Sequence, residues 1–160
     1  MGSVANSDAV NAHMNRRDLL LAILAAAEGQ PYEPVQVQKA TFLVVRNVPA
    51  LIGEGASYTF KPYDYGPFDS AVYEEAEGLE RDGLAFIRPS ASGRWKTYAA
   101  SEKGIAEGGR ILAGLSPELR QYLVDIARWV RSQSFSGLVT AIYNAYPEMK
   151  INSVFQDATA

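Results

Sequence analysis

One segment near the middle of the chain constrains the fold more than any other. A helical pattern ends in Glu80-Arg81-Asp82-Gly83-Leu84, where glycine favours the left-handed backbone that terminates helices. Residues 84–88 are then predicted as a strand, Pro89-Ser90-Ala91-Ser92-Gly93 as a turn, and residues 94–100 as the returning strand. Ser101-Glu102-Lys103-Gly104 then begins another helix. The sequence therefore predicts an antiparallel two-stranded wing between two helices.

The other helices are predicted from apolar spacing and capping residues. Ser116-Pro117 is a strong helix start, because serine caps the helix and proline needs no hydrogen bond at the first helical position. The apolar residues from Leu119 to Val130 follow helical spacing. Pro67 is expected to begin a helix that ends near Gly83. The predicted helices span residues 15–29, 34–47, 67–83, 101–112, 117–130 and 136–146, with a short strand at 58–61.

This order of elements is that of a winged helix. We predict an α+β, mostly helical fold, with a winged-helix-like core, a small antiparallel β wing and two additional C-terminal helices. The 160 residues, 48% of them hydrophobic, suffice for one compact domain. We assign residues 14–155 to a single globular domain and residues 156–160 to a loose C-terminal tail. Residues 1–13 lack periodicity, and either a leader left by an expression vector or a disordered tail accounts for them.

The composition removes most catalytic and metal chemistry. The chain has no cysteine, which excludes disulfides, thiol nucleophiles and thiolate metal sites. Its single histidine, His13, lies outside the predicted domain and leaves no histidine there for a catalytic triad or a metal site. We therefore expect a protein that is not an enzyme, with no cofactor and no metal.

No membrane-spanning segment is visible in the sequence. The longest apolar run, Leu19 to Ala27, is far shorter than the roughly 20 residues that a bilayer span needs. No basic and then apolar signal peptide with a cleavage site is present. We expect a cytoplasmic protein with no membrane partner.

The charge pattern argues against DNA recognition by the helix predicted over residues 67–83. That helix occupies the recognition position of a winged helix, yet it contains one basic residue, Arg81, and six acidic residues. The acidic residues are Asp69, Glu74, Glu75, Glu77, Glu80 and Asp82. Carboxylates that approach the phosphate backbone are repelled by it. The wing favours the opposite conclusion, because Arg88, Arg94 and Lys96 suit phosphate contacts, although solvated strand edges carry the same residue types. A winged-helix DNA-binding transcriptional regulator is therefore the alternative prediction.

Aromatic residues gather between residues 58 and 73, and core packing around a tight turn accounts for some of them. Tyrosine combines a large contact area with a polar group that stays in water, so exposed members suit a protein interface. We predict that a basic protein partner binds the surface formed by Tyr63, Tyr65, Phe68, Asp69, Glu74 and Glu77. A homodimer through the apolar stripe from Leu119 to Val130 stays open, because that stripe is equally a core face.

Two segments resemble a known family. Val37-Gln38-Lys39-Ala40-Thr41-Phe42-Leu43 is similar to a stretch on the second helix of the SocA/Panacea-type antitoxin domain and its YwgA-like relatives. Tyr63-Asp64-Tyr65-Gly66-Pro67-Phe68, followed by Val72-Tyr73, resembles the Gly-Pro signature of that family. Tyr146-Pro147-Glu148 and Asn152-Ser153 resemble the end of the YwgA-like members, to which this sequence looks closer. The similarity spans residues 16–155.

The resemblance implies a small bacterial or phage-borne protein without enzymatic activity. In the antitoxin members of the family, the domain neutralises a toxin or adapts it to a protease by direct contact. The resemblance therefore implies a protein partner, with a toxin as one candidate, and it carries over no catalytic residue.

Overall fold

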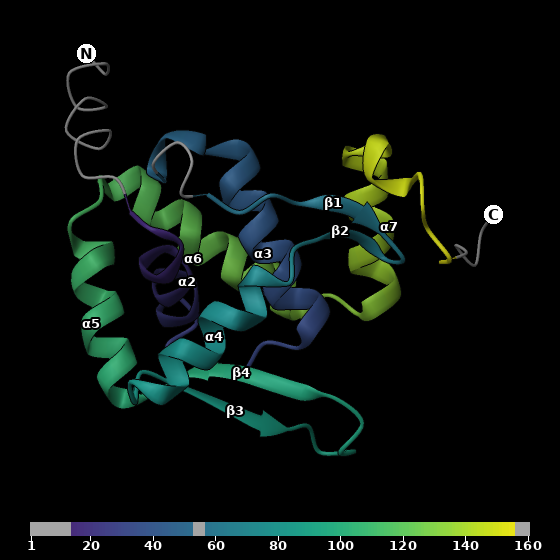
Figure 1. Ribbon diagram of the computed structural model, residues 1–160. Coiled ribbons are helices and arrows are strands. Elements are labelled where there is room, and N and C mark those ends of the chain that lie inside the picture. The colour runs from purple at the N-terminus through teal and green to yellow at the C-terminus, as the bar shows by residue number, and fades with distance from the viewer. Residues whose placement is uncertain (1–13, 53–56, 156–160) are drawn as a thin grey trace, which may run out of the picture.

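The computed structural model describes residues 14–52 and 57–155, and within them the fold is α+β and mostly helical (Figure 1). These residues form six helices and two antiparallel sheets of two strands each. The expectations for residues 1–13 and 156–160 lie outside the described residues. The helices are α2 (Arg16–Ala25), α3 (Pro34–Asn47), α4 (Ala71–Arg81), α5 (Glu102–Ala113), α6 (Pro117–Ser132) and α7 (Phe135–Ala145); the strands are β1 (Lys61–Tyr63), β2 (Gly66–Phe68), β3 (Ala85–Pro89) and β4 (Lys96–Ala100); short 3-10 turns are η1 (Pro49–Leu51) and η2 (Pro147–Lys150).

Helix α2 is the centre of the core. Its residues from Leu19 to Ala25 are all buried, and α3, α4, α5 and α6 all contact it. Figure 1 shows α2 between α5, α6 and α4. The sequence predicted one apolar face for this helix, but a helix that is apolar on every side belongs inside a protein. The surrounding helices therefore pack against all sides of α2.

Two glycines allow α5 to approach its neighbours closely. A Cβ atom on Gly108 would meet Ala25 and the Leu21 carbonyl of α2, and a Cβ on Gly104 would meet the Leu84 carbonyl at the base of β3. Any larger residue at these positions would push α5 away from the core.

The predicted wing is confirmed as the β3–β4 hairpin, with a register from Ala85↔Ala100 to Pro89↔Lys96. A serine caps each of the two following helices, which confirms the cap predicted at Ser116. The Ser101 hydroxyl accepts the Gly104 N–H at 3.0 Å, and the Ser116 hydroxyl accepts the Leu119 N–H at 3.2 Å. The order from α2 to α5 is thus winged-helix-like, with α6 and α7 as the two additional C-terminal helices.

The prediction that Pro67 begins a helix is wrong. Pro67 lies in β2, which pairs with β1 from Lys61↔Phe68 to Tyr63↔Gly66. Gly66 turns this hairpin with a left-handed φ of 101°.

Helix α4 instead begins at Ala71. The Asp69 carboxylate accepts the N–H groups of Ala71 at 2.9 Å and Thr59 at 2.7 Å, so it connects the first residue of the helix to the segment that leads into β1. The strand predicted at residues 58–61 accordingly lies further along, at Lys61–Tyr63.

Within the described residues, none of the helices combines the length and the apolar character that a bilayer span needs.

Candidate protein-interaction surface

Two neighbouring polar residues of α3 hold the β1–β2 hairpin and the segment that follows it. The Gln38 side chain, 1% exposed, donates to the Asp69 carbonyl at 2.9 Å and accepts the Asp69 N–H at 3.1 Å. Lys39 Nζ donates to the Pro67 carbonyl at 3.2 Å. Buried backbone groups need such partners. The two segments that carry the family resemblance are therefore hydrogen-bonded to each other.

Lys39 is an unusual component of this junction. It is 3% exposed, and within the described part of the chain no carboxylate forms an ion pair with it. Burial lowers the pKa of Lys39 to about 7, because the charged ammonium is poorly solvated there. Gly66 lies close to it, since a Cβ at Gly66 would approach Lys39 Cε at 3.6 Å and the Tyr143 ring at 3.3 Å. The hairpin turn thus fits between α3 and α7.

An aromatic row runs from the β1–β2 hairpin to the wing. Tyr63 stacks on Phe68 with ring centroids 5.2 Å apart, and Phe68 contacts Tyr73 of α4 edge to face at 5.9 Å. Tyr73 in turn stacks on Tyr98 of β4 at 5.5 Å. Tyr63 is 55% exposed and Tyr98 is buried, so the row extends from the surface into the core. At the outer end of the row, the stacking contact with Phe68 holds the Tyr63 ring in place.

The second exposed tyrosine, Tyr65, packs against the C-terminal part of the chain. Its ring meets Phe135 of α7 edge to face at 5.1 Å, and Phe135 meets Phe155 at 6.1 Å. The backbone N–H of Val154 donates to the Asp64 carbonyl at the hairpin turn at 3.0 Å. Tyr65 is still 44% exposed, so it is a fixed ring with a free face. Phe135 and Phe155, which support this ring, are not among the site residues predicted from the sequence.

The predicted acidic residues fall into two groups. Asp69 bonds within the fold, and its carboxylate serves the backbone. Glu74 and Glu77 are exposed on α4, and within the described ranges neither forms an ion pair. Glu77 lies near Tyr98, whose pKa is raised to about 12 by burial first and by the charges of Tyr73 and Glu77 second. Glu77 therefore lies toward Tyr98, the end of the aromatic row opposite the exposed Tyr63.

The remaining carboxylates around α4 are engaged by neighbours. Glu75 lies 3.6 Å from Arg16, and Asp82 lies 2.9 Å from Arg17. Glu80 accepts the Ile87 N–H at 3.0 Å. Of the acidic residues predicted on this helix, Glu74 and Glu77 are therefore the ones whose carboxylates stay available to a partner.

The three basic residues of the wing do not share one face. Arg88 lies opposite Thr97 and Lys96 lies opposite Pro89 in the register, and side chains of successive residues point to opposite sides of a strand. The Arg88 guanidinium covers the Phe86 ring at 4.2 Å. Arg94 is exposed in the turn. The wing therefore presents dispersed cations. Two exposed tryptophans, Trp95 in the wing turn and Trp129 on α6, lie outside the aromatic row.

In the described residues, no group of three or more histidine, cysteine, aspartate or glutamate side chains is placed to hold a metal ion.

A comparison with protein-family models and one with curated proteins give no match to this chain. The resemblance to the SocA/Panacea-type and YwgA-like domains accordingly stays a prediction that depends on the short motifs given above.

Proposed function

We propose that this protein is a non-enzymatic protein-interaction module of an antitoxin-like or phage-associated kind that acts in the cytoplasm. Its partner is a protein with a basic surface, and a toxin is one candidate. The observation that carries the proposal is the pair of half-exposed tyrosines, Tyr63 and Tyr65, each held by an aromatic neighbour at the β1–β2 hairpin.

Fixed aromatic rings suit protein recognition for a physical reason. Association immobilises side chains, and a ring that is already held loses less conformational entropy when a partner covers it. Tyrosine also keeps a hydroxyl group for hydrogen bonding at the edge of the contact. Tyr63 and Tyr65 therefore supply apolar contact area together with polar specificity.

The acidic residues of α4 favour a partner whose surface is positively charged. Glu74 and Glu77 are exposed on α4, and Glu77 lies toward Tyr98 at the inner end of the aromatic row. Unpaired carboxylates at the edge of an interface attract a basic partner and speed the encounter. The same charges repel phosphates from the helix that would enter a DNA groove. Contact with a basic protein is therefore favoured over contact with DNA.

The test is quantitative affinity capture from the native host with matched variants. A partner that binds this surface should be retained by the wild type and lost with Tyr65→Ala or Glu77→Lys. Trp129→Ala and Glu118→Lys are the controls, because both change an exposed residue of α6, away from this surface, and should retain the partner. Circular dichroism checks that each variant folds. Identical capture by all variants would refute the surface.

A second measurement addresses the DNA-binding alternative. Titration of a mixed-sequence duplex at low salt should give no binding. Submicromolar binding that weakens steeply with salt, and that is lost with Arg94→Glu and Lys96→Glu together, would favour a transcriptional regulator.

A further inference from the structure

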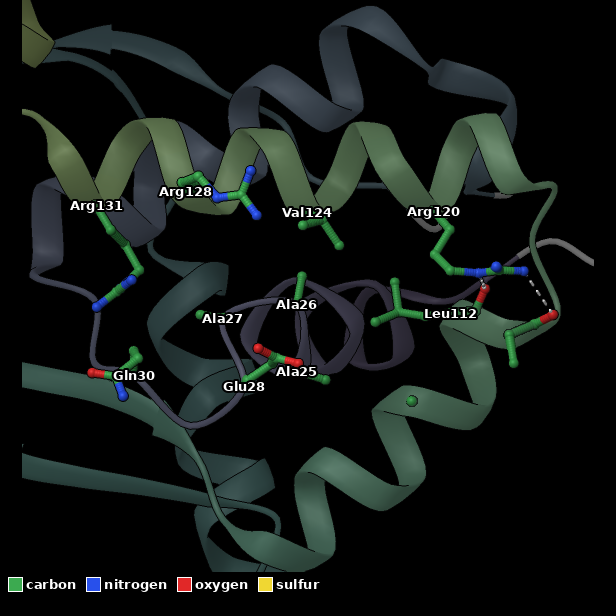
Figure 2. A pocket seen from close by; sticks show the side chains of 12 residues that line it. Ala25, Ala26, Ala27, Glu28, Gln30, Leu112, Arg120, Val124, Arg128 and Arg131 are labelled. Atoms are coloured by element: carbon green, nitrogen blue, oxygen red, sulfur yellow. Dashed lines mark hydrogen bonds between the residues drawn. The ribbon is translucent and has the colours of Figure 1, made fainter.

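A groove lies between the end of α2 and the facing sides of α5 and α6 (Figure 2). Its volume is about 660 Å³, within the range of clefts that bind ligands. We propose that this groove binds an acidic segment of a partner protein, with aliphatic side chains of that segment on the floor and its carboxylates on the rim. Neither the β1–β2 hairpin nor α4 lines the groove, so this inference goes beyond the proposed function.

The floor of the groove is apolar. Ala25, Ala26 and Ala27 at the end of α2 lie between Leu112 of α5 and Val124 of α6 (Figure 2). Because alanine side chains are short, the groove can take aliphatic side chains from a ligand without moving the helices. Burial of apolar area is the main favourable term when a peptide docks in a groove.

The rim of the groove is cationic. Arg120, Arg128 and Arg131 of α6 all line it, and Figure 2 shows them along one side of that helix. Together with Val124 they recur at intervals of three and four residues, which places them on one helix face. One face of α6 thus supplies both an apolar contact and three positive charges.

Two of these guanidinium groups are held in place by the protein. Arg120 Nε donates to the Leu112 carbonyl at 3.1 Å, and its Nη2 donates to the Leu115 carbonyl at 3.2 Å. Arg131 Nε donates to the Pro31 carbonyl at 2.9 Å. Within the described residues, the two terminal nitrogens of Arg131 make no hydrogen bond, because the bond to Pro31 is donated by Nε. A fixed guanidinium with free N–H groups binds a carboxylate at a reduced entropic penalty.

The local charge is opposite to that of the whole chain. The rim carries three arginines and one carboxylate, Glu28, whereas the chain has a net charge of −3. The Arg128 side chain is 74% exposed, and Asp125 lies 3.9 Å from it, beyond hydrogen-bond distance. An acidic ligand therefore finds an attraction in this groove that the net charge of the chain would not predict.

A peptide fits this groove better than a nucleic acid does. Single-stranded nucleic acids stack their bases on aromatic rings, and duplexes need phosphates neutralised along a line of cations. Among the described residues that line the groove there is no aromatic side chain on which a base could stack. The alanine floor instead suits aliphatic side chains of a peptide.

The test uses the full chain and a displayed library of random peptides as the probe. Selection runs on the wild type, with counter-selection on the double variant Arg128→Glu, Arg131→Glu. The expected result is enrichment of peptides in which Asp or Glu flanks Leu, Ile or Val. In fluorescence anisotropy, these peptides should bind the wild type at least about tenfold more tightly than the double variant, and added salt should weaken binding.

Matched variants separate the groove from general charge effects. The double variant Lys103→Glu, Arg110→Glu makes the same change in net charge at exposed positions of α5 outside the groove. It should leave the affinity within about twofold, since salt screens exposed charges that do not contact the ligand. Glu28→Gln removes the one carboxylate of the rim and should tighten binding about twofold to threefold. Circular dichroism checks that each variant folds.

Three outcomes would overturn the proposal. One is a selection that yields no acidic peptide whose binding depends on Arg128 and Arg131. Another is a mixed-sequence DNA duplex that binds more tightly than any recovered peptide and is weakened by the same double variant. The third is self-association that this variant abolishes, which would assign the groove to a second copy of the chain. None of them involves Tyr65 or Glu77, so a failure here is distinct from a failure of the proposed function.

Discussion

The two hairpins of this protein have the same antiparallel topology but are held in different ways. The β3–β4 wing is attached at its base. The backbone of Tyr98 exchanges hydrogen bonds with Tyr32 at 2.8 and 2.9 Å, and the Ser101 hydroxyl donates to the Gly83 carbonyl at 2.7 Å. The far end of the wing, with its turn at residues 90–95, is mostly exposed.

The β1–β2 hairpin is anchored by buried side chains instead. Gln38 and Lys39 of α3 bond the backbone of Asp69 and Pro67, and the Val154 N–H bonds the turn from the other side. A hairpin of three-residue strands has little stability of its own. Its exposed tip is therefore positioned by the rest of the molecule, which is what a binding surface requires, whereas the tip of the wing is free to vary.

The largest effect is expected where the wing meets the core. Gly104→Ala would place a methyl group against the Leu84 carbonyl, and we expect it to lower the free energy of unfolding by about 3 kcal/mol. Gly109→Ala is the control, because a Cβ there meets no atom within 4 Å and alanine stabilises a helix. Urea unfolding followed by circular dichroism measures both. Equal stabilities would show that α5 adjusts its position freely.

A slightly smaller loss is expected at the anchor of the other hairpin. Gln38→Ala would leave the N–H and C=O of Asp69 without their side-chain partner, and we expect a loss of about 2 kcal/mol in the free energy of unfolding. Gln121→Ala, at an exposed position of α6, should change it by less than about 0.5 kcal/mol. The same urea titration distinguishes the two. A neutral Gln38→Ala would mean that β1–β2 is not held by α3.

The lysine of this anchor should make stability depend on pH. The pKa of Lys39 falls from its ordinary 10.5 to about 7 on folding, so between these values the unfolded chain binds more protons than the folded one. The penalty is fully present below pH 7 and is lifted as the pH rises toward 10.5. Lys39→Met also removes the hydrogen bond to the Pro67 carbonyl, which offsets part of the gain. It should still raise the free energy of unfolding at pH 6 by about 2 kcal/mol and flatten its rise at higher pH.

Denaturant titrations between pH 6 and 9.5 measure this effect, with Lys103→Met as the control at an exposed position. The upper limit avoids the tyrosines. Burial raises the pKa of Tyr32 and Tyr58 above their ordinary value of 10.0, so stability is lost through them only at higher pH. A rise with pH that persists in Lys39→Met would assign it to another group.

The smallest changes in the free energy of unfolding are expected at the exposed tips of the two hairpins. Tyr65→Ala removes the edge-to-face contact with Phe135 and should lower the free energy of unfolding by about 1 kcal/mol. Arg94→Ala in the wing turn should change it by less than about 0.5 kcal/mol. Thermal unfolding resolves the order of the two. A larger loss at Arg94 would reverse our comparison of the hairpins.

Local signals were sufficient to predict the wing and the helices around it. Capping residues and turn chemistry act over a few positions, so the cap at Ser116 and the helix start at Ser101 are predicted correctly. Pro67 was misassigned because its surroundings are set by Lys39, which is 28 residues away in sequence. No pattern within the hairpin reveals that contact, because the lysine lies on α3.

The candidate surfaces were predictable only in part. Tyr63 and Tyr65 are exposed as expected, whereas the predicted contact residue Asp69 is occupied with the backbone. The arginines of α6 recur at helical spacing, and that signal was present in the sequence. What it could not show is that the alanines at the end of α2 lie against them, because this depends on how α2, α5 and α6 pack.

The positions of the two tryptophans give the protein a built-in optical readout. Trp95 on the wing and Trp129 on α6 are both partly open to solvent. We expect quenching or a blue shift of their emission when a ligand covers either element. Trp95→Phe leaves only the α6 signal, so unlabelled peptides can be titrated against that helix without a dye.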